Sequence, residues 1–133
     1  MGMYTEFVCA IELKKDTPKE VINILNNMIE GENRYDITPP HPFFECRRWR
    51  WLFITDSYYF SGRSNTMFEY DDITKTHYLT IRSNLKNYDD EINKFLNWIK
   101  PYIQIHCEDD EFLGYSRYEE CRNPELIYYN KIQ

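Results

Sequence analysis

The sequence predicts an α+β protein, in which two helices pack on one face of a single, mainly antiparallel sheet. Two segments place apolar residues at the three- and four-residue spacing of an amphipathic helix. Six other segments are rich in β-branched and aromatic residues, and short turns join several of them. Two amphipathic helices would leave a sheet bare if they packed only on each other, so both are expected on the same side of it. The expected order is strand, helix, three strands, helix, two strands, which is a ferredoxin-like sandwich with an extra C-terminal hairpin.

The first strand and the first helix have the clearest local signals. Residues 4–13 alternate between apolar and polar side chains, which predicts a strand with one buried face. Thr17 can cap the amide of Glu20, Glu20 can reach back, and Pro18 suits the first helical position. Gly31 is well placed to end this helix. A proline-rich loop at residues 32–42 is expected to follow it.

The segment 43–60, FFECRRWRWLFITDSYYF, is predicted to be the strand around which the sheet is organised. In a strand, successive side chains point to opposite faces. Trp49 and Trp51 would then share one face, and Arg48 and Arg50 the other. Because neither face is purely polar, this strand is expected at the centre of the sheet.

The second half of the chain continues the same pattern. Its elements are expected in the order strand, strand, helix, strand, strand, at residues 66–70, 76–83, 87–101, 112–119 and 125–129. Asn87 or Asp89 is expected to cap the helix, and Pro101 to end or kink it.

Length, charge and composition limit the function classes. The 133 residues are expected to form one domain, residues 1–133, and the net charge of −6 disfavours a general nucleic-acid binder. No apolar run reaches the length of a membrane span and no secretory signal is visible, so we expect a soluble, cytoplasmic protein without a membrane partner. Four cysteines without a C-x-x-C pair predict reduced thiols, with no metal site and no cofactor.

The candidate binding residues lie in the segment 43–60, where arginines and aromatic residues alternate. They are Arg48, Trp49, Arg50, Trp51, Tyr58 and Tyr59. Proteins that bind single-stranded nucleic acids use such side chains for phosphate contacts and base stacking. Alternatively, the arginines stack on the tryptophans or pair with acidic residues. The acidic groups near residues 71, 90 and 110 could mimic phosphates, but ordinary turns and helix caps explain them as well.

No catalytic residue is predicted, because the sequence has no nucleophile elbow, P-loop, paired-carboxylate motif or H-E-x-x-H. The stretches that cover most of the chain are YTEFVCAIELKKDTPKEVINIL, HPFFECRRWRW with SYYF after it, RSNLKNYDDEINKFLNWIKPYI, and FLGYSRYEE followed by PELIYY. Together they resemble a family of small uncharacterised phage and prophage proteins of bacterial hosts. No activity is assigned to that family, so the resemblance implies no catalytic or binding residue.

The resemblance implies an accessory role, and the leading hypothesis is stoichiometric binding to a host or defence protein. Inhibition of a defence system, as by an anti-CRISPR protein, is one form of it. The alternative is a single-stranded nucleic-acid binder that uses the arginine and tryptophan strand. A third hypothesis is a small enzyme whose site is assembled from distant residues. The sequence does not determine the oligomeric state.

Overall fold

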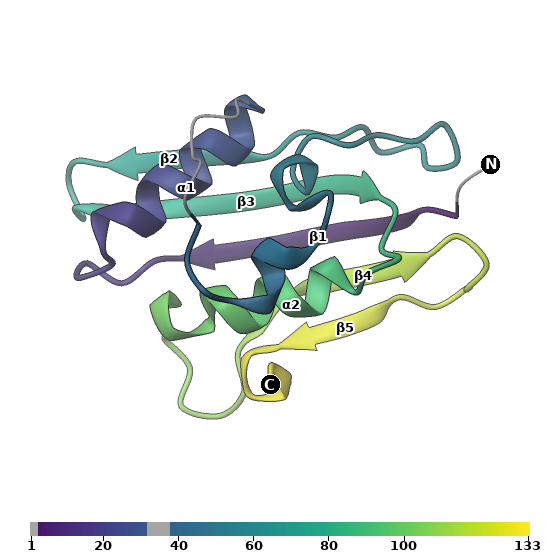
Figure 1. Ribbon diagram of the computed structural model, residues 1–133. Coiled ribbons are helices and arrows are strands. Elements are labelled where there is room, and N and C mark those ends of the chain that lie inside the picture. Colours follow the sequence, from purple (N-terminus) through teal and green to yellow (C-terminus); the bar gives the residue numbers. More distant parts are fainter. Residues whose placement is uncertain (1–2, 32–37) are drawn as a thin grey trace.

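One antiparallel sheet of five strands carries both helices on the same face (Figure 1). This computed structural model describes residues 3–31 and 38–133, so much of the predicted loop at 32–42 lies outside the described residues. The strands are β1 (Thr5–Glu12), β2 (Met67–Asp71), β3 (Thr76–Leu85), β4 (Phe112–Tyr118) and β5 (Glu125–Tyr128). Their order in the sheet is β2-β3-β1-β4-β5, and every neighbouring pair is antiparallel. The predicted α+β class is therefore confirmed.

Strand β1 lies at the centre of the sheet, between β3 and β4. Its alternating sequence places Phe7, Cys9 and Ile11 on the helix-covered face, where each is at most 3% exposed. Leu13, directly after the strand, is also fully buried. The first strand was thus predicted correctly, but its central position was assigned to another segment.

The two helices and the segment that begins at residue 38 lie on this side of the sheet and share its core (Figure 1). The helices are α1 (Lys19–Glu30) and α2 (Glu91–Ile99), and they bury the apolar stripes expected from their spacing. Gly31 ends α1 in the left-handed conformation (φ 70°), as predicted. None of the helices in residues 3–31 and 38–133 is long and apolar enough to cross a membrane.

The helix caps agree with the sequence only in part. The predicted capping box at the start of α1 is wrong, because the Thr17 hydroxyl donates to the Lys14 carbonyl (2.6 Å) and Pro18 takes the N-cap position. At the start of α2, Asp90 takes the N-cap position in place of the predicted Asn87 or Asp89, but the Asn87 side chain still accepts a hydrogen bond from the Ile92 amide (3.0 Å).

The predicted strand at 43–60 is wrong. The segment forms two short 3₁₀ helices, η1 (Pro42–Glu45) and η2 (Trp49–Trp51), followed by a loop that leads into β2. Its backbone donors are satisfied locally: the Cys46 amide donates to the Phe43 carbonyl (3.1 Å), and the Leu52 amide to the Trp49 carbonyl (3.3 Å). The three consecutive strands expected between the helices are therefore only two, and these form the hairpin of β2 and β3.

A spacing of three residues explains this conformation. In a 3₁₀ helix, residues i and i+3 lie on the same side. Phe43, Cys46, Trp49 and Leu52 follow this spacing, and all four are buried. The segment therefore covers the core as a third element beside the helices, and its charged side chains lie between the buried positions.

An aromatic cluster joins this segment to α2. The Phe43 ring is fully buried and lies 5.5 Å from the Phe95 ring and 6.0 Å from the Trp98 ring, measured between centroids. Phe44 makes an edge contact with Trp98 (5.0 Å). Such ring pairs add to the free energy gained from burying their apolar area.

Replacing Phe43 by alanine should lower the free energy of unfolding by about 3 to 5 kcal/mol, because it leaves a cavity between η1 and α2. Trp51→Ala is the matched control: Trp51 is 48% exposed, and its loss should have a small effect. Urea unfolding followed by far-UV circular dichroism measures both. Equal destabilisation by the two substitutions would contradict the packing of this segment.

Candidate functional site

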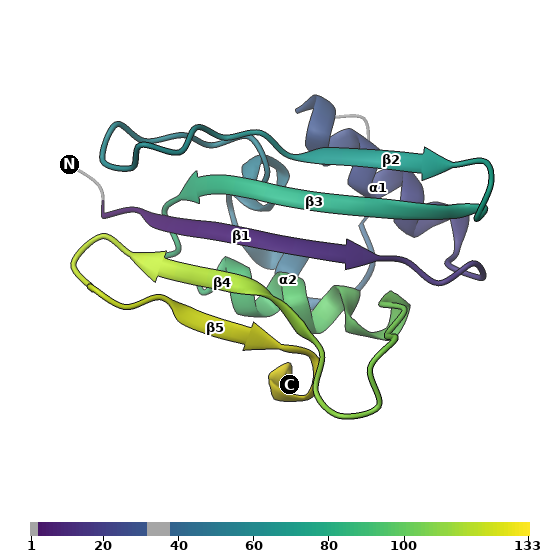
Figure 2. The same ribbon diagram turned by 180° about the vertical axis from the view of Figure 1, so that it is seen from behind.

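The side of the sheet opposite α1 and α2 is covered by neither helix (Figure 2). The strand register determines which side chains lie there, because residues paired across antiparallel strands point to the same side. We call this surface the helix-free face. It is formed by Glu6, Val8, Ala10, Glu12, Met67, Glu69, Tyr78, Thr80, Arg82, Tyr115, Arg117 and Leu126.

The middle of the helix-free face carries short side chains, and exposed apolar side chains lie on its outer strands. Ala10 of β1 and Thr80 of β3 are paired at its centre, and both are exposed. Met67 on β2 and Leu126 on β5 flank them with 44% and 48% of their surfaces exposed. Exposed apolar side chains that gather on one surface are typical of interaction sites.

A buried carboxylate lies at one end of this face. The side chain of Glu6 is only 4% exposed, and its two oxygens are bound by two different arginines. Arg82 on β3 donates to Oε2 (2.5 Å), and Arg117 on β4 donates through Nε to Oε1 (3.2 Å). Such charge-assisted hydrogen bonds are stronger than neutral ones and fix the positions of both guanidinium groups.

Arg82 is held from several sides. Burial lowers its pKa, but hydrogen bonds to Tyr115 and Glu6 outweigh this effect, and the pKa lies above the ordinary value of arginine. The guanidinium group also lies against Gly62, where a Cβ atom would come within 1.5 Å of its nitrogen. A glycine at this position therefore lets the loop approach the arginine.

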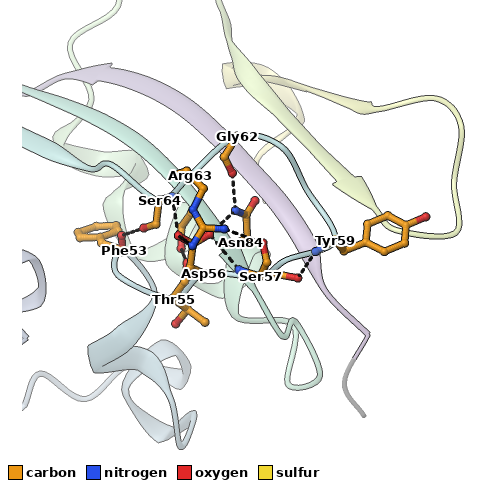
Figure 3. Close-up of polar contacts among 10 residues, drawn as sticks. Phe53, Thr55, Asp56, Ser57, Tyr59, Gly62, Arg63, Ser64 and Asn84 are labelled. Carbon is orange, nitrogen blue, oxygen red and sulfur yellow. Dashed lines mark hydrogen bonds and ion pairs between the residues drawn. The ribbon is translucent and has the colours of Figure 1, made fainter.

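The loop between η2 and β2 is attached to the end of β3 through Asn84 (Figure 3). The Asn84 side chain is fully buried, and its amide donates to the Asp56 carboxylate (2.8 Å) and to the Gly62 carbonyl (2.7 Å). Asp56 also accepts hydrogen bonds from the Ser57 amide (2.9 Å) and the Ser64 amide (3.2 Å). These bonds keep Gly62 beside Arg82.

The Asp56 carboxylate is stabilised in its charged form. Burial raises the pKa of Asp56. The hydrogen bonds from Asn84, Ser57 and Ser64 and the charge of Arg63 lower it by more, so the pKa lies below its ordinary value. The Arg63 guanidinium lies 3.1 Å from the carboxylate. Asp56 is therefore ionised at neutral pH and organises the loop as an anion.

The sequence-predicted residues at 48–51 do not form one surface. Trp49 is only 5% exposed and packs against η1, whereas Trp51 is 48% exposed, so the two rings do not share a face as predicted. Arg50 stacks over the Trp49 ring (4.8 Å), and Arg48 lies over the Tyr88 ring (5.8 Å). This agrees with the stacking alternative. The strand on which the nucleic-acid alternative placed these residues is absent, because the segment forms 3₁₀ helices.

Tyr58 and Tyr59 lie at the tip of the loop that precedes β2. Tyr58 is 98% exposed, with the Arg63 guanidinium 5.5 Å from its ring. The Tyr59 hydroxyl donates to the Glu119 carbonyl (2.6 Å) and so connects the loop to the turn between β4 and β5. Of the predicted residues, Tyr59 is the one that the structure brings next to Glu6 and its arginines.

Sequence reasoning missed Glu6, Arg82 and Arg117. Their signal is a charged residue at an alternating position inside each predicted strand, as in YTEFVC, TIRS and YSRY. The strand order β3-β1-β4 is needed to bring them together, and the sequence does not specify it.

The histidines of the described chain lie in three separate environments. His41 shares a hydrogen bond with Asn97 (2.8 Å), and His106 with Glu12 (2.6 Å). His77 packs between two aromatic rings, and burial lowers its pKa. These positions do not combine two histidines in one pocket.

The buried thiols are poor nucleophiles. Burial raises the pKa of Cys9 to about 12 and also raises that of Cys46, so both are protonated at neutral pH. In residues 3–31 and 38–133, no group of three or more histidine, cysteine, aspartate or glutamate side chains could hold a metal ion.

Glu6→Gln should lower the free energy of unfolding by about 2 kcal/mol, because it removes the charge that Arg82 and Arg117 share. Glu69→Gln is the control on the same face, since Glu69 is exposed. Urea unfolding at neutral pH measures the difference. If both variants unfold at the same denaturant concentration, the buried carboxylate does not stabilise the fold.

Asp56→Asn should destabilise the protein by about 1 to 2 kcal/mol near pH 7 and by less near pH 3. The depressed pKa of Asp56 means that its stabilisation is present above the pKa of the unfolded carboxyl group, and is lost as the pH falls through the folded pKa. Unfolding curves of wild type and variant at both pH values measure this, with Asp72→Asn in an exposed turn as the control. A difference that does not change with pH would contradict the role of the ionised form.

Comparisons with known proteins add no further residue to this site. No protein-family model matches the chain, and no curated protein or solved structure matches it. The functional interpretation therefore rests on the geometry of the helix-free face.

Proposed function

We propose that this chain is a small phage- or prophage-type accessory protein that binds a host or defence protein stoichiometrically through its helix-free face. The observation that supports this most is the exposed apolar surface of that face, with Ala10 at its centre and Met67 and Leu126 on the outer strands β2 and β5. The same sheet buries a continuous apolar row on its other side, so its open side is available for a partner.

The shape of the face suits a flat protein surface. Ala10 and Thr80 present short side chains at the centre, whereas the larger Met67, Tyr115 and Leu126 lie on β2, β4 and β5. Large aromatic and thioether side chains are enriched in protein interfaces, where they supply most of the buried apolar area. A partner that lies flat on the sheet would contact all five strands.

The charges at the two ends of the face favour a particular orientation of the partner. Arg82 and Arg117 lie at the end where β1 begins, and Glu12 and Glu69 lie toward the end where it finishes. A partner with the opposite arrangement, acidic beside the arginines and basic beside the glutamates, is favoured electrostatically. Such complementarity guides the orientation of binding more than it adds affinity.

We also propose that the fold is a ferredoxin-like sandwich extended by β5. The order β2-β3-β1-β4 supports this assignment, with α1 following β1 and α2 following β3. The hairpin of β4 and β5 supplies the additional strand at the edge.

Affinity purification from a bacterial host lysate tests the proposed function with two variants that carry the same new side chain. Ala10→Arg places a long charged group at the centre of the helix-free face, and it should reduce capture of the partner at least tenfold. Ile73→Arg is the control, because Ile73 is 92% exposed in the turn between β2 and β3.

The captured partner is then purified, mixed with the chain and analysed by size-exclusion chromatography with light scattering. We expect a complex of fixed stoichiometry with wild type and with Ile73→Arg, and little complex with Ala10→Arg. Absence of a specific partner, or equal binding by both variants, would refute binding through this face.

A further inference from the structure

A hollow lies on the helix-free face at the end where β1 begins, between the loop before β2 and the turn that joins β4 to β5. Its volume is about 590 Å³, which is within the range of small-molecule sites. Its lining includes Glu6, Tyr59, Arg82, Tyr115, Arg117 and Arg122. The hydrogen bond from Tyr59 to the Glu119 carbonyl (2.6 Å) joins the loop to the turn and so fixes the relative position of these walls.

The hollow is positively charged although the whole protein carries a net charge of −6. Three arginines line it, with one carboxylate, Glu6, so the sum of these side-chain charges is three minus one, or plus two. Within residues 3–31 and 38–133, no carboxylate forms an ion pair with Arg122. Glu119 and Glu120 line a neighbouring hollow that shares Arg117 and Arg122.

Two of the three guanidinium groups are held in place before any ligand arrives. Arg117 uses Nε for its bond to Glu6 (3.2 Å) and lies over the Phe60 ring (5.1 Å), so its two terminal nitrogens remain for another acceptor. Arg82 is fixed by Glu6 (2.5 Å) and by the adjacent Gly62. Pre-organised guanidinium groups bind oxyanions well, because little side-chain entropy is lost on binding.

We propose that this hollow, which we call the arginine hollow, binds the phosphate or diphosphate group of a small molecule. A dianionic phosphate matches the charge of plus two, and its oxygens accept hydrogen bonds from the guanidinium nitrogens that are not already bound to Glu6. The tyrosine side chains of Tyr59 and Tyr115 provide apolar surface for the rest of the ligand. This inference goes beyond the proposed protein partner and does not depend on it.

Isothermal titration calorimetry of the purified chain with inorganic pyrophosphate, at low ionic strength, tests the site. We expect saturable binding at one site, and Arg122→Gln should weaken it at least fivefold. The control is Arg47→Gln, which removes the same charge from an exposed residue outside the arginine hollow and should change the affinity less than twofold.

Gly62→Ala separates geometry from charge. It retains every arginine, but the added Cβ would collide with the Arg82 guanidinium and displace it, so binding should weaken at least threefold. Circular dichroism and urea unfolding verify that the variants remain folded, and Arg122 is exposed enough for its replacement to leave the fold intact.

Two further titrations identify the ligand class. If adenosine diphosphate binds as tightly as pyrophosphate, the hollow recognises the phosphate groups alone. If adenosine diphosphate binds more tightly than pyrophosphate, the ligand is a nucleotide. Citrate carries carboxylates in place of phosphate and should bind at least fivefold more weakly. The proposal is overturned if pyrophosphate gives no saturable binding, if citrate binds equally well, or if Arg47→Gln weakens binding as much as Arg122→Gln.

Discussion

The pairing of β1 with a strand on each side is the constraint on which the rest of the structure depends. Its hydrogen bonds to β3 and β4 fix the register of three strands at once, and that register decides which side chains point to each face. Phe7 and Ile11 then anchor the helices, while Glu6 and Ala10 face the opposite side. A slip of one residue would bury the glutamates under the helices and expose the core.

Much of the fold could be predicted from the sequence, because its signals are local. The alternation in β1, the apolar stripes of both helices and the glycine that ends α1 each depend on a few neighbouring residues. The segment 43–60 differs from the predicted strand, because its β-prone residues form short 3₁₀ helices that pack on the core. Four of its buried residues, Phe43, Cys46, Trp49 and Leu52, recur every three positions, which is the spacing of a 3₁₀ helix, although Phe44, Phe53 and Phe60 are buried outside this spacing.

The candidate site could not be predicted in the same way, because its residues meet only through long-range pairing. Glu6 and Arg82 are 76 positions apart in the chain, and Glu6 and Arg117 are 111 apart. Each is an ordinary charged residue in its own segment, and only the strand order gives the three a common environment. Trp49 and Trp51 do not share a face for a related reason, because local packing buries one ring and leaves the other exposed. The binding role of residues 48–51, 58 and 59 stays a prediction.

The outer strands of the sheet affect how copies of the chain behave in concentrated solution. β2 and β5 are five and four residues long, and acidic side chains, Glu69, Asp71 and Glu125, lie along them. Short edge strands that carry like charges disfavour pairing with a strand of another molecule, and such edge-to-edge pairing leads to fibrillar aggregation. The helix-free face can therefore remain exposed without copies of the chain pairing through the edges of their sheets.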